Sequence, residues 1–216
     1  MRLVADRLKE HVPGSELTTY GIGGPVRALL TIESADELAA VSALLWREGQ
    51  ATRIVGRGSN CLIADSGLDE WVLRLGAGFR SVESCGSGEL RVGGAAALMN
   101  LARRVSDDGM SGLEFAAGIP ASLGGAAFMN AGAHGAELSE RVVRLEGVLP
   151  DGAPRVWGRD ELPWRYRHSG LPEGAVVTAV VLKLVDGDTK KISALDRKST
   201  RLNSSHIPLS RMPSSA

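Results

Sequence analysis

The chain has 216 residues, which is enough for one sizeable domain or for two small lobes that share a core. Its 25 lysines and arginines balance 25 aspartates and glutamates. The charge therefore excludes a generally basic surface for nucleic acid or an anionic membrane, and recognition of any anion has to be local. Two cysteines outside any CxxC spacing, and no apolar run near the roughly 18 residues that span a bilayer, favour a soluble, cytoplasmic protein.

A strand, a helix and a second strand are predicted in the first third of the chain. Residues 26–32 (VRALLTI) form a β-rich run, and the capping-box sequence Ser34-Ala-Asp-Glu37 predicts a helix that continues to about Arg47. Residues 53–56 (RIVG) then predict a short buried strand. This order describes a small α/β lobe over residues 17–66, which contains a first cluster of glycines.

The next part of the chain is predicted to alternate strands and glycine turns around one helix. Apolar side chains at helical spacing predict a helix over residues 96–108 that packs into the core, and Gly109 suits the position just past its end. The apolar positions of this helix are Leu98, Leu101, Ala102 and Val105. Strands are predicted over residues 71–75, 81–85, 90–92, 142–149 and 176–185, with a turn at Asp151-Gly152.

Four segments follow from this pattern. A helical lead-in covers residues 1–16, the small α/β lobe residues 17–66, and a larger α+β lobe residues 67–188. Residues 189–216 differ from the rest, because they are rich in serine and basic residues and have no sustained periodicity. We interpret them as a non-native-looking or disordered tail and exclude them from fold reasoning.

The first motif with chemical meaning is Gly56-Arg57-Gly58-Ser59-Asn60, directly after a predicted strand. Its glycines let backbone N–H groups approach an anion closely, and successive amides in such a turn form a concave nest that suits phosphate. The spacing matches neither a Walker A loop nor GxGxxG, and the residues that follow indicate no helix. Taken alone, the motif is equally compatible with a tight turn that binds no ligand.

A second glycine-rich stretch runs from Gly118 to Gly135. Pro120 fixes a turn, and the small residues 124–127 permit close backbone packing against a flat ligand or another element. Alone, this stretch slightly favours a close-packed helix without a ligand. Beside a phosphate nest, it indicates a large, flat, phosphate-bearing cofactor.

Two polar residues around the second stretch are expected to have structural roles. We interpret Glu114 as fixing a loop by hydrogen bonding, because no partner for a catalytic carboxylate is evident. His134 is expected to be a turn residue or a satisfied donor. No second ligand stands at metal-binding spacing, so no metal site is predicted.

The third motif is Trp164-Arg-Tyr-Arg-His-Ser169. Its second arginine, Arg167, can pair with phosphate or stabilise negative charge that develops on a substrate oxygen. In an arbitrary sequence such a cluster is more often a solvated surface. The three motifs in this order are much more specific than any one of them.

Together with residues 19–24 (TYGIGG), these motifs resemble the UDP-N-acetylenolpyruvoylglucosamine reductase (UDP-N-acetylmuramate dehydrogenase) family. The similarity runs from about residue 17 to 185 and includes Gly112-Leu-Glu114 and residues 129–135 (MNAGAHG). It implies a two-lobed α+β FAD-binding domain of the vanillyl-alcohol-oxidase (PCMH) type. The family's C-terminal substrate domain, with its proton-donating serine and acidic partner, has no match in this sequence.

The resemblance implies roles for individual residues. Arg167 would be the catalytic arginine that stabilises an enol-type charge, and Ser169 belongs to the same element and is not the family's proton donor. Tyr166 and Asn130 would contact the substrate. The implied cofactor-binding residues are Gly56, Arg57, Gly58, Ser59, Asn60, Gly118, Ile119, Pro120, Ser122, Gly124, Gly125 and Val177.

In the family, NADPH reduces FAD, and the reduced flavin delivers hydride to UDP-N-acetylglucosamine enolpyruvate to give UDP-N-acetylmuramate. This reaction implies a part in peptidoglycan precursor synthesis, and through it in cell-wall biogenesis, cell shape and cell division. Without a proton donor we expect this chain to bind FAD as a monomer but to reduce substrate negligibly. Two alternatives stay open: another FAD-dependent oxidoreductase of the same fold that acts on a different alcohol or olefin, and a non-catalytic flavin-binding module.

Overall fold

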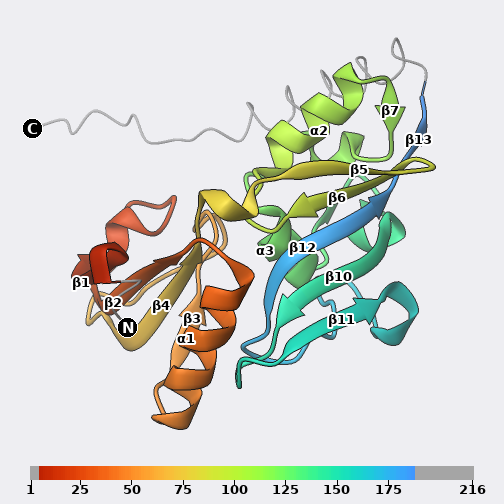
Figure 1. Ribbon diagram of the computed structural model, residues 1–216. Coiled ribbons are helices and arrows are strands. Elements are labelled where there is room, and N and C mark those ends of the chain that lie inside the picture. Colours follow the sequence, from red (N-terminus) through yellow and green to blue (C-terminus); the bar gives the residue numbers. More distant parts are fainter. Residues whose placement is uncertain (1–4, 188–216) are drawn as a thin grey trace, which may run out of the picture.

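The structure is a computed structural model that describes residues 5–187, so the tail predicted over residues 189–216 lies outside the described residues. Two larger sheets and their helices form two lobes (Figure 1). The first sheet has the strand order β1-β2-β4-β3 and the second the order β11-β10-β12-β6-β5. Among residues 5–187, no helix is both long and apolar enough to cross a membrane.

The first lobe is a mixed sheet with one helix. Strand β1 (Leu8–Pro13) pairs antiparallel with β2 (Pro25–Ile32), whereas β4 (Leu68–Leu75) lies parallel to both β2 and β3 (Thr52–Ile54). Helix α1 (Ala35–Arg47) follows β2 and buries its apolar side chains against the sheet. The order of strand, helix and strand predicted for this region is therefore confirmed.

The structure differs from the predicted segments in two places. Residues 5–16 were predicted as a helical lead-in, but they form β1 between the single 3₁₀ turns η1 (Ala5–Arg7) and η2 (Gly14–Glu16). Strand β4 was assigned to the larger lobe, but it hydrogen-bonds between β2 and β3, so the first lobe extends beyond residue 66. In both cases pairing with a strand distant in the sequence determines the structure, and local propensity cannot indicate that pairing.

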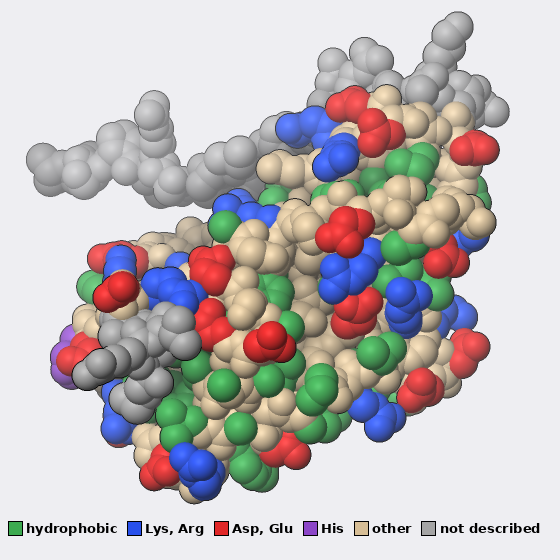
Figure 2. Space-filling model, in the orientation of Figure 1, with side chains coloured by type: hydrophobic (Ala, Val, Ile, Leu, Met, Phe, Trp, Pro, Cys, Tyr) green, Lys and Arg blue, Asp and Glu red, His purple; other side chains and the backbone are tan. Residues whose placement is uncertain are grey.

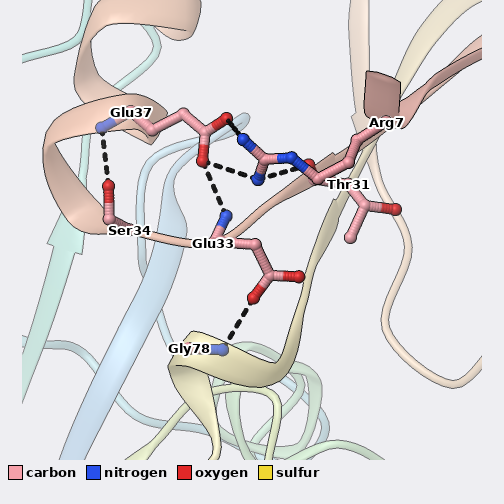
Figure 3. Close-up of polar contacts among 6 residues, drawn as sticks. All are labelled: Arg7, Thr31, Glu33, Ser34, Glu37 and Gly78. Atoms are coloured by element: carbon pink, nitrogen blue, oxygen red, sulfur yellow. Dashed lines mark hydrogen bonds and ion pairs between the residues drawn. The ribbon is translucent and has the colours of Figure 1, made fainter. Parts of the chain in front are cut away.

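The start of α1 is held by a network of hydrogen bonds (Figure 3). The Ser34 hydroxyl accepts the Glu37 N–H at 3.2 Å, which confirms the predicted N-cap. The Glu37 carboxylate accepts the Glu33 N–H at 2.8 Å and pairs with the Arg7 guanidinium, whose Nη1 donates at 2.9 Å. Glu33 in turn accepts the Gly78 N–H at 2.7 Å, so the network joins η1, α1 and the connection to the second lobe.

The second lobe is a five-stranded antiparallel sheet with β12 (Val176–Lys183) at its centre. Every residue of β12 is buried except the terminal lysine, because α3 (Leu123–Phe128) covers this strand. Helix α2 (Leu98–Asp107) buries the four apolar positions predicted for it, and Gly109 adopts a φ of 74° just past its end, as expected. The remaining strands of the sheet are β5 (Val82–Gly86), β6 (Glu89–Gly93), β10 (Val142–Val148) and β11 (Pro154–Gly158).

Short elements connect these strands. Their bounds are η3 (Ala77–Phe79), β7 (Met110–Ser111), η4 (Glu114–Gly118), β8 (Gly132–Ala133), β9 (Ala136–Glu137), η5 (Leu138–Glu140), η6 (Arg159–Glu161) and β13 (Val185–Asp186). The two lobes also touch, because α1 packs on β10 and the apolar core of the first lobe includes Val148 and Val176 of the second. The described part of the face in Figure 2 carries basic and acidic side chains interspersed.

Candidate functional site

A large cleft lies where the two lobes meet, with a volume of about 1590 Å³. It exceeds the roughly 300–1,000 Å³ of ordinary small-molecule pockets, so it has room for a ligand of dinucleotide size. Its lining includes residues 56–60 of the first lobe, residues 119–122 of the second, and Arg167. The three motifs that the sequence singled out therefore border one cavity.

The loop Gly56–Asn60 is held in a conformation that requires glycine. The Val55 N–H donates to the Leu73 carbonyl at 3.0 Å, which fixes the start of the loop to β4. Gly58 has a φ of +69°, and a Cβ there would lie closer than 3.0 Å to the carbonyl oxygen of Leu17. The Gly58 carbonyl accepts the Thr19 N–H at 3.0 Å, so the TYGIGG segment (residues 19–24) is hydrogen-bonded to the loop.

The backbone amides of this loop are available to a ligand. In the part of the chain that the structure describes, the N–H groups of residues 56–59 donate to no protein acceptor. Unpaired amides are tolerated only where water or a ligand satisfies them, and these border a cleft. Four successive amides without a protein acceptor are what the predicted anion-binding nest requires.

The second glycine-rich stretch meets this loop directly. Ser122 is the N-cap of α3, and its hydroxyl accepts the Gly125 N–H at 3.4 Å. A Cβ on Gly56 would overlap this hydroxyl, so loop and N-cap are in contact. Gly124 serves packing, because its N–H donates to Gly94 at 2.8 Å and its Cα faces the sheet, whereas Gly125 is exposed at the cleft.

Arg167 lies at the tip of a tight turn. Reciprocal backbone hydrogen bonds of 2.9 and 3.0 Å join Arg165 and His168, which leaves Tyr166 and Arg167 between them. Arg167 has a φ of +56°, a conformation that costs a non-glycine residue free energy and that is found preferentially at functional sites. The turn directs Arg167 to the cleft lining, with its guanidinium 5.3 Å from the centre of the Tyr166 ring.

Three of the predicted site residues do not line the cleft. Tyr166 is 79% exposed, and Gly118 ends η4 beside the lining residue Ile119. Asn130 is fully buried: its amide donates to Glu137 at 2.7 Å and to the Arg165 carbonyl at 3.0 Å, and its oxygen accepts a backbone N–H at 3.1 Å. The polar atoms of Asn130 are thus already satisfied within the protein, and its contact with substrate stays a prediction. Through the Arg165 carbonyl, Asn130 anchors the turn that carries Arg167.

The cleft is positively charged although the chain is neutral. Of its charged lining residues six are arginines and two are glutamates, Glu16 and Glu173. The arginines are Arg53, Arg57, Arg74, Arg80, Arg104 and Arg167. Low-dielectric walls strengthen the field of such a cluster, so the cleft favours an anionic ligand, as the charge balance led us to expect. Four of these arginines, Arg53, Arg74, Arg80 and Arg104, were not predicted as site residues, and the one local signal in the sequence was Arg74, a charge near the end of an apolar strand.

The structural role predicted for Glu114 is confirmed. Its carboxylate accepts the Ser111 hydroxyl at 2.6 Å and the Gly112 N–H at 3.0 and 3.1 Å, which fixes the loop before the second glycine stretch. His134 is a turn residue with a φ of 57°. Within residues 5–187, no group of three or more histidine, cysteine or acidic side chains is placed to hold a metal ion.

Comparison with known proteins relates this cleft to flavin binding. Residues 26–156 match the FAD binding domain family. The chain is 36% identical over 190 residues to UDP-N-acetylenolpyruvoylglucosamine reductase of Bacillus velezensis, an alignment that covers 87% of this chain and 62% of that protein. The crystal structure of UDP-N-acetylenolpyruvylglucosamine reductase from Thermus caldophilus matches with a TM-score of 0.80 and 35% identity, over 92% of this chain and 70% of that one.

A more distant match shows the fold alone. Cholesterol oxidase from Brevibacterium sterolicum aligns with a TM-score of 0.64 at 13% identity, over 86% of this chain and 38% of that one. These likenesses confirm the predicted two-lobed α+β FAD-binding fold of the vanillyl-alcohol-oxidase type. The chain spans less than two thirds of the length of curated relatives such as the Bacillus velezensis protein.

Proposed function

The chain belongs to the UDP-N-acetylenolpyruvoylglucosamine reductase family of FAD-binding proteins, and on that premise we propose that its cleft binds FAD for the NADPH-dependent reduction of UDP-N-acetylglucosamine enolpyruvate. The product of that reaction is UDP-N-acetylmuramate, a precursor of peptidoglycan. The observation that carries the proposal is the row of free amides at residues 56–59. These amides border a cleft whose charged lining residues are mostly arginines.

The residues of the cleft fit FAD. The nest at residues 56–59 offers N–H donors for a pyrophosphate. Gly58 gives the loop a conformation that no side chain fits, because a Cβ there would clash with the backbone of Leu17. Ile119, Pro120 and Val177 supply apolar surface of the kind that an isoalloxazine ring requires. Bound FAD would supply the hydride chemistry, by accepting hydride from NADPH and donating it to the enolpyruvyl double bond.

Arg167 is the residue we assign to charge stabilisation. Its turn is fixed by Asn130, whose amide donates to the Arg165 carbonyl. A pre-positioned cation costs no reorganisation when enol-type negative charge develops as the enolpyruvyl double bond accepts hydride. Tyr166, exposed beside it at the rim, is assigned to substrate contact.

The proposal is tested first by flavin binding. The purified 216-residue chain is titrated with FAD, and quenching of flavin fluorescence is followed together with the visible absorbance of the retained cofactor. We expect a yellow protein with one FAD per chain. A colourless protein that leaves flavin fluorescence unchanged would contradict the proposal.

Electron transfer and substrate class are tested on the yellow protein. Anaerobic NADPH should bleach the flavin absorbance, and failure to bleach would favour a non-catalytic flavin-binding module. UDP-N-acetylglucosamine enolpyruvate should shift the oxidised flavin spectrum, and Arg167→Gln should abolish that shift. Arg165→Gln is the matched control, because it removes an arginine from the same turn that does not line the cleft. A spectral shift produced only by a different olefin or alcohol would identify another oxidoreductase of the same fold.

A further inference from the structure

One arginine of the cleft differs from the other five. Arg74 is half-buried, whereas the remaining arginines of the lining are exposed. Its Nε is shielded from solvent and has no hydrogen-bond partner. Among residues 5–187, its guanidinium forms no ion pair either. A strongly basic group is thus held partly out of water without a protein anion.

The position of Arg74 places it beside the nest. It is the penultimate residue of β4, and the preceding residue, Leu73, accepts the Val55 N–H that anchors the loop at 3.0 Å. Strand β3, which leads into that loop, lies parallel to β4, so the carboxyl ends of both strands point in the same direction. Arg74 therefore lies on the strand to which the start of the loop is hydrogen-bonded, and it lines the same cleft as residues 56–59.

Two acidic residues, Glu70 of β4 and Glu173 of the cleft lining, lie toward Arg53 and form no ion pair with Arg74. Glu70, on the same face of β4, pairs with Arg53, whose Nε lies 2.6 Å from the carboxylate. Glu173 is 95% exposed and also lies toward Arg53, at 4.0 Å. Partial burial lowers the pKa of Arg74, which shows that its surroundings disfavour the charge. Because arginine does not give up its proton in proteins, an anion bound in the cleft would compensate this charge.

We propose that Arg74 is an anion-positioning residue of the cleft, which pairs with a phosphate of the dinucleotide whose pyrophosphate the amides of residues 56–59 hold. This inference rests on the proposed binding of FAD. The amides supply directional donors and Arg74 supplies the full positive charge that a nest of neutral groups lacks. The planar guanidinium can also present two parallel donors in a fixed fork to one phosphate, a geometry that the ammonium group of lysine lacks.

The inference predicts opposite effects on affinity and on the stability of the ligand-free protein. Arg74→Met keeps the aliphatic length and removes the charge. It should weaken FAD binding by about 10–100-fold, as expected for loss of a charged hydrogen bond. Without ligand, the same variant should melt at the same temperature as the wild type or higher, because an uncompensated charge has been removed from a partly buried site. A merely structural arginine would instead lower the melting temperature.

The experiment compares two flavins by fluorescence titration. Riboflavin has the same ring as FAD but no phosphate, so its affinity should not change in Arg74→Met. Arg74→Lys should recover part of the FAD affinity. Arg47→Gln, an exposed arginine at the end of α1 outside the cleft, is the control and should leave both affinities unchanged.

The outcomes separate this inference from the proposed function. If the wild type binds FAD and Arg74→Met binds it as tightly, the inference is wrong while the proposed function stands. A parallel loss of FAD affinity, riboflavin affinity and melting temperature would likewise overturn it in favour of a packing role. If the wild type binds no FAD, the proposed function and the inference fall together.

Discussion

Gly58 offers the sharpest test of the nest, because two separate penalties oppose any side chain there. Its φ of +69° lies in the left-handed region, where an L-residue costs about 1–2 kcal/mol. A Cβ would also lie within 3.0 Å of three backbone atoms in Leu17 and Thr18. Those atoms belong to the segment that hydrogen-bonds the loop, so they cannot move away freely.

Gly49 is a matched control for the first penalty. It follows α1 with a φ of +64°, but a Cβ at this position has nothing within 4 Å. Gly49→Ala should therefore measure the conformational cost alone, reduced by roughly 0.4–1 kcal/mol because alanine restricts the unfolded chain. Gly58→Ala adds overpacking of about 1–3 kcal/mol.

The difference between the two variants gives the expected magnitude. We expect Gly49→Ala to destabilise by about 0–1.5 kcal/mol and Gly58→Ala by about 1–4.5 kcal/mol, measured as the free energy of unfolding in urea. For a chain of this size each kcal/mol lowers Tm by roughly 2–4 °C. FAD affinity should fall in Gly58→Ala and stay constant in Gly49→Ala. Equal stability losses in the two variants, with FAD affinity retained, would refute the assigned loop conformation.

Three further predictions concern stability. Ser34→Ala removes the N-cap of α1 and should cost about 1 kcal/mol in urea unfolding. Asn130→Gly and Asn130→Ala both remove buried hydrogen bonds and should lower the free energy of unfolding by about 2–4 kcal/mol. Alanine should be the more destabilising of the two, because the φ of Asn130 is 44°. A loss of stability under about 1 kcal/mol would contradict the anchoring role. Burial opposes ionisation of Glu37, but hydrogen bonds from Arg7 and the Glu33 N–H outweigh it and lower the pKa of Glu37. The difference in unfolding free energy between the wild type and Glu37→Gln should therefore be constant above about pH 4.3. It should shrink as the pH falls through the depressed pKa.

The elements that depend on local pattern were predictable from the sequence. Helix α1 begins after Ser34 because the capping hydroxyl and the apolar spacing are both local, and α2 buries its apolar stripe for the same reason. The pairing of β4 between β2 and β3 depends on contacts across the sheet, and no local feature encodes them. The strand β1 was mistaken for a helical lead-in for the same physical reason.

The candidate site was predictable where backbone conformation determines it. Gly58 could be assigned because the conformation of the loop requires glycine, whereas Ser122 was implied only by the family resemblance and its role as an N-cap was not predicted. The anchoring role of Asn130 could not be assigned, because its sequence neighbours do not reveal that Glu137 and the Arg165 carbonyl already occupy its amide. Arg74 was missed because its significance lies in the lack of a partner, and only three-dimensional packing determines that.

The contact between Gly56 and Ser122 links ligand binding to the junction of the lobes. The nest belongs to the first lobe and the N-cap of α3 to the second, and they touch at the cleft. A dinucleotide that spans both would bind only when the lobes keep this arrangement, so binding should stabilise the two lobes as one cooperative unit. At a ligand concentration of 100 times Kd, the gain would be about 2.7 kcal/mol. Unfolding of the two lobes in a single transition that moves to higher denaturant with FAD would support this coupling, whereas a shift confined to one of two separate transitions would place the ligand on one lobe alone.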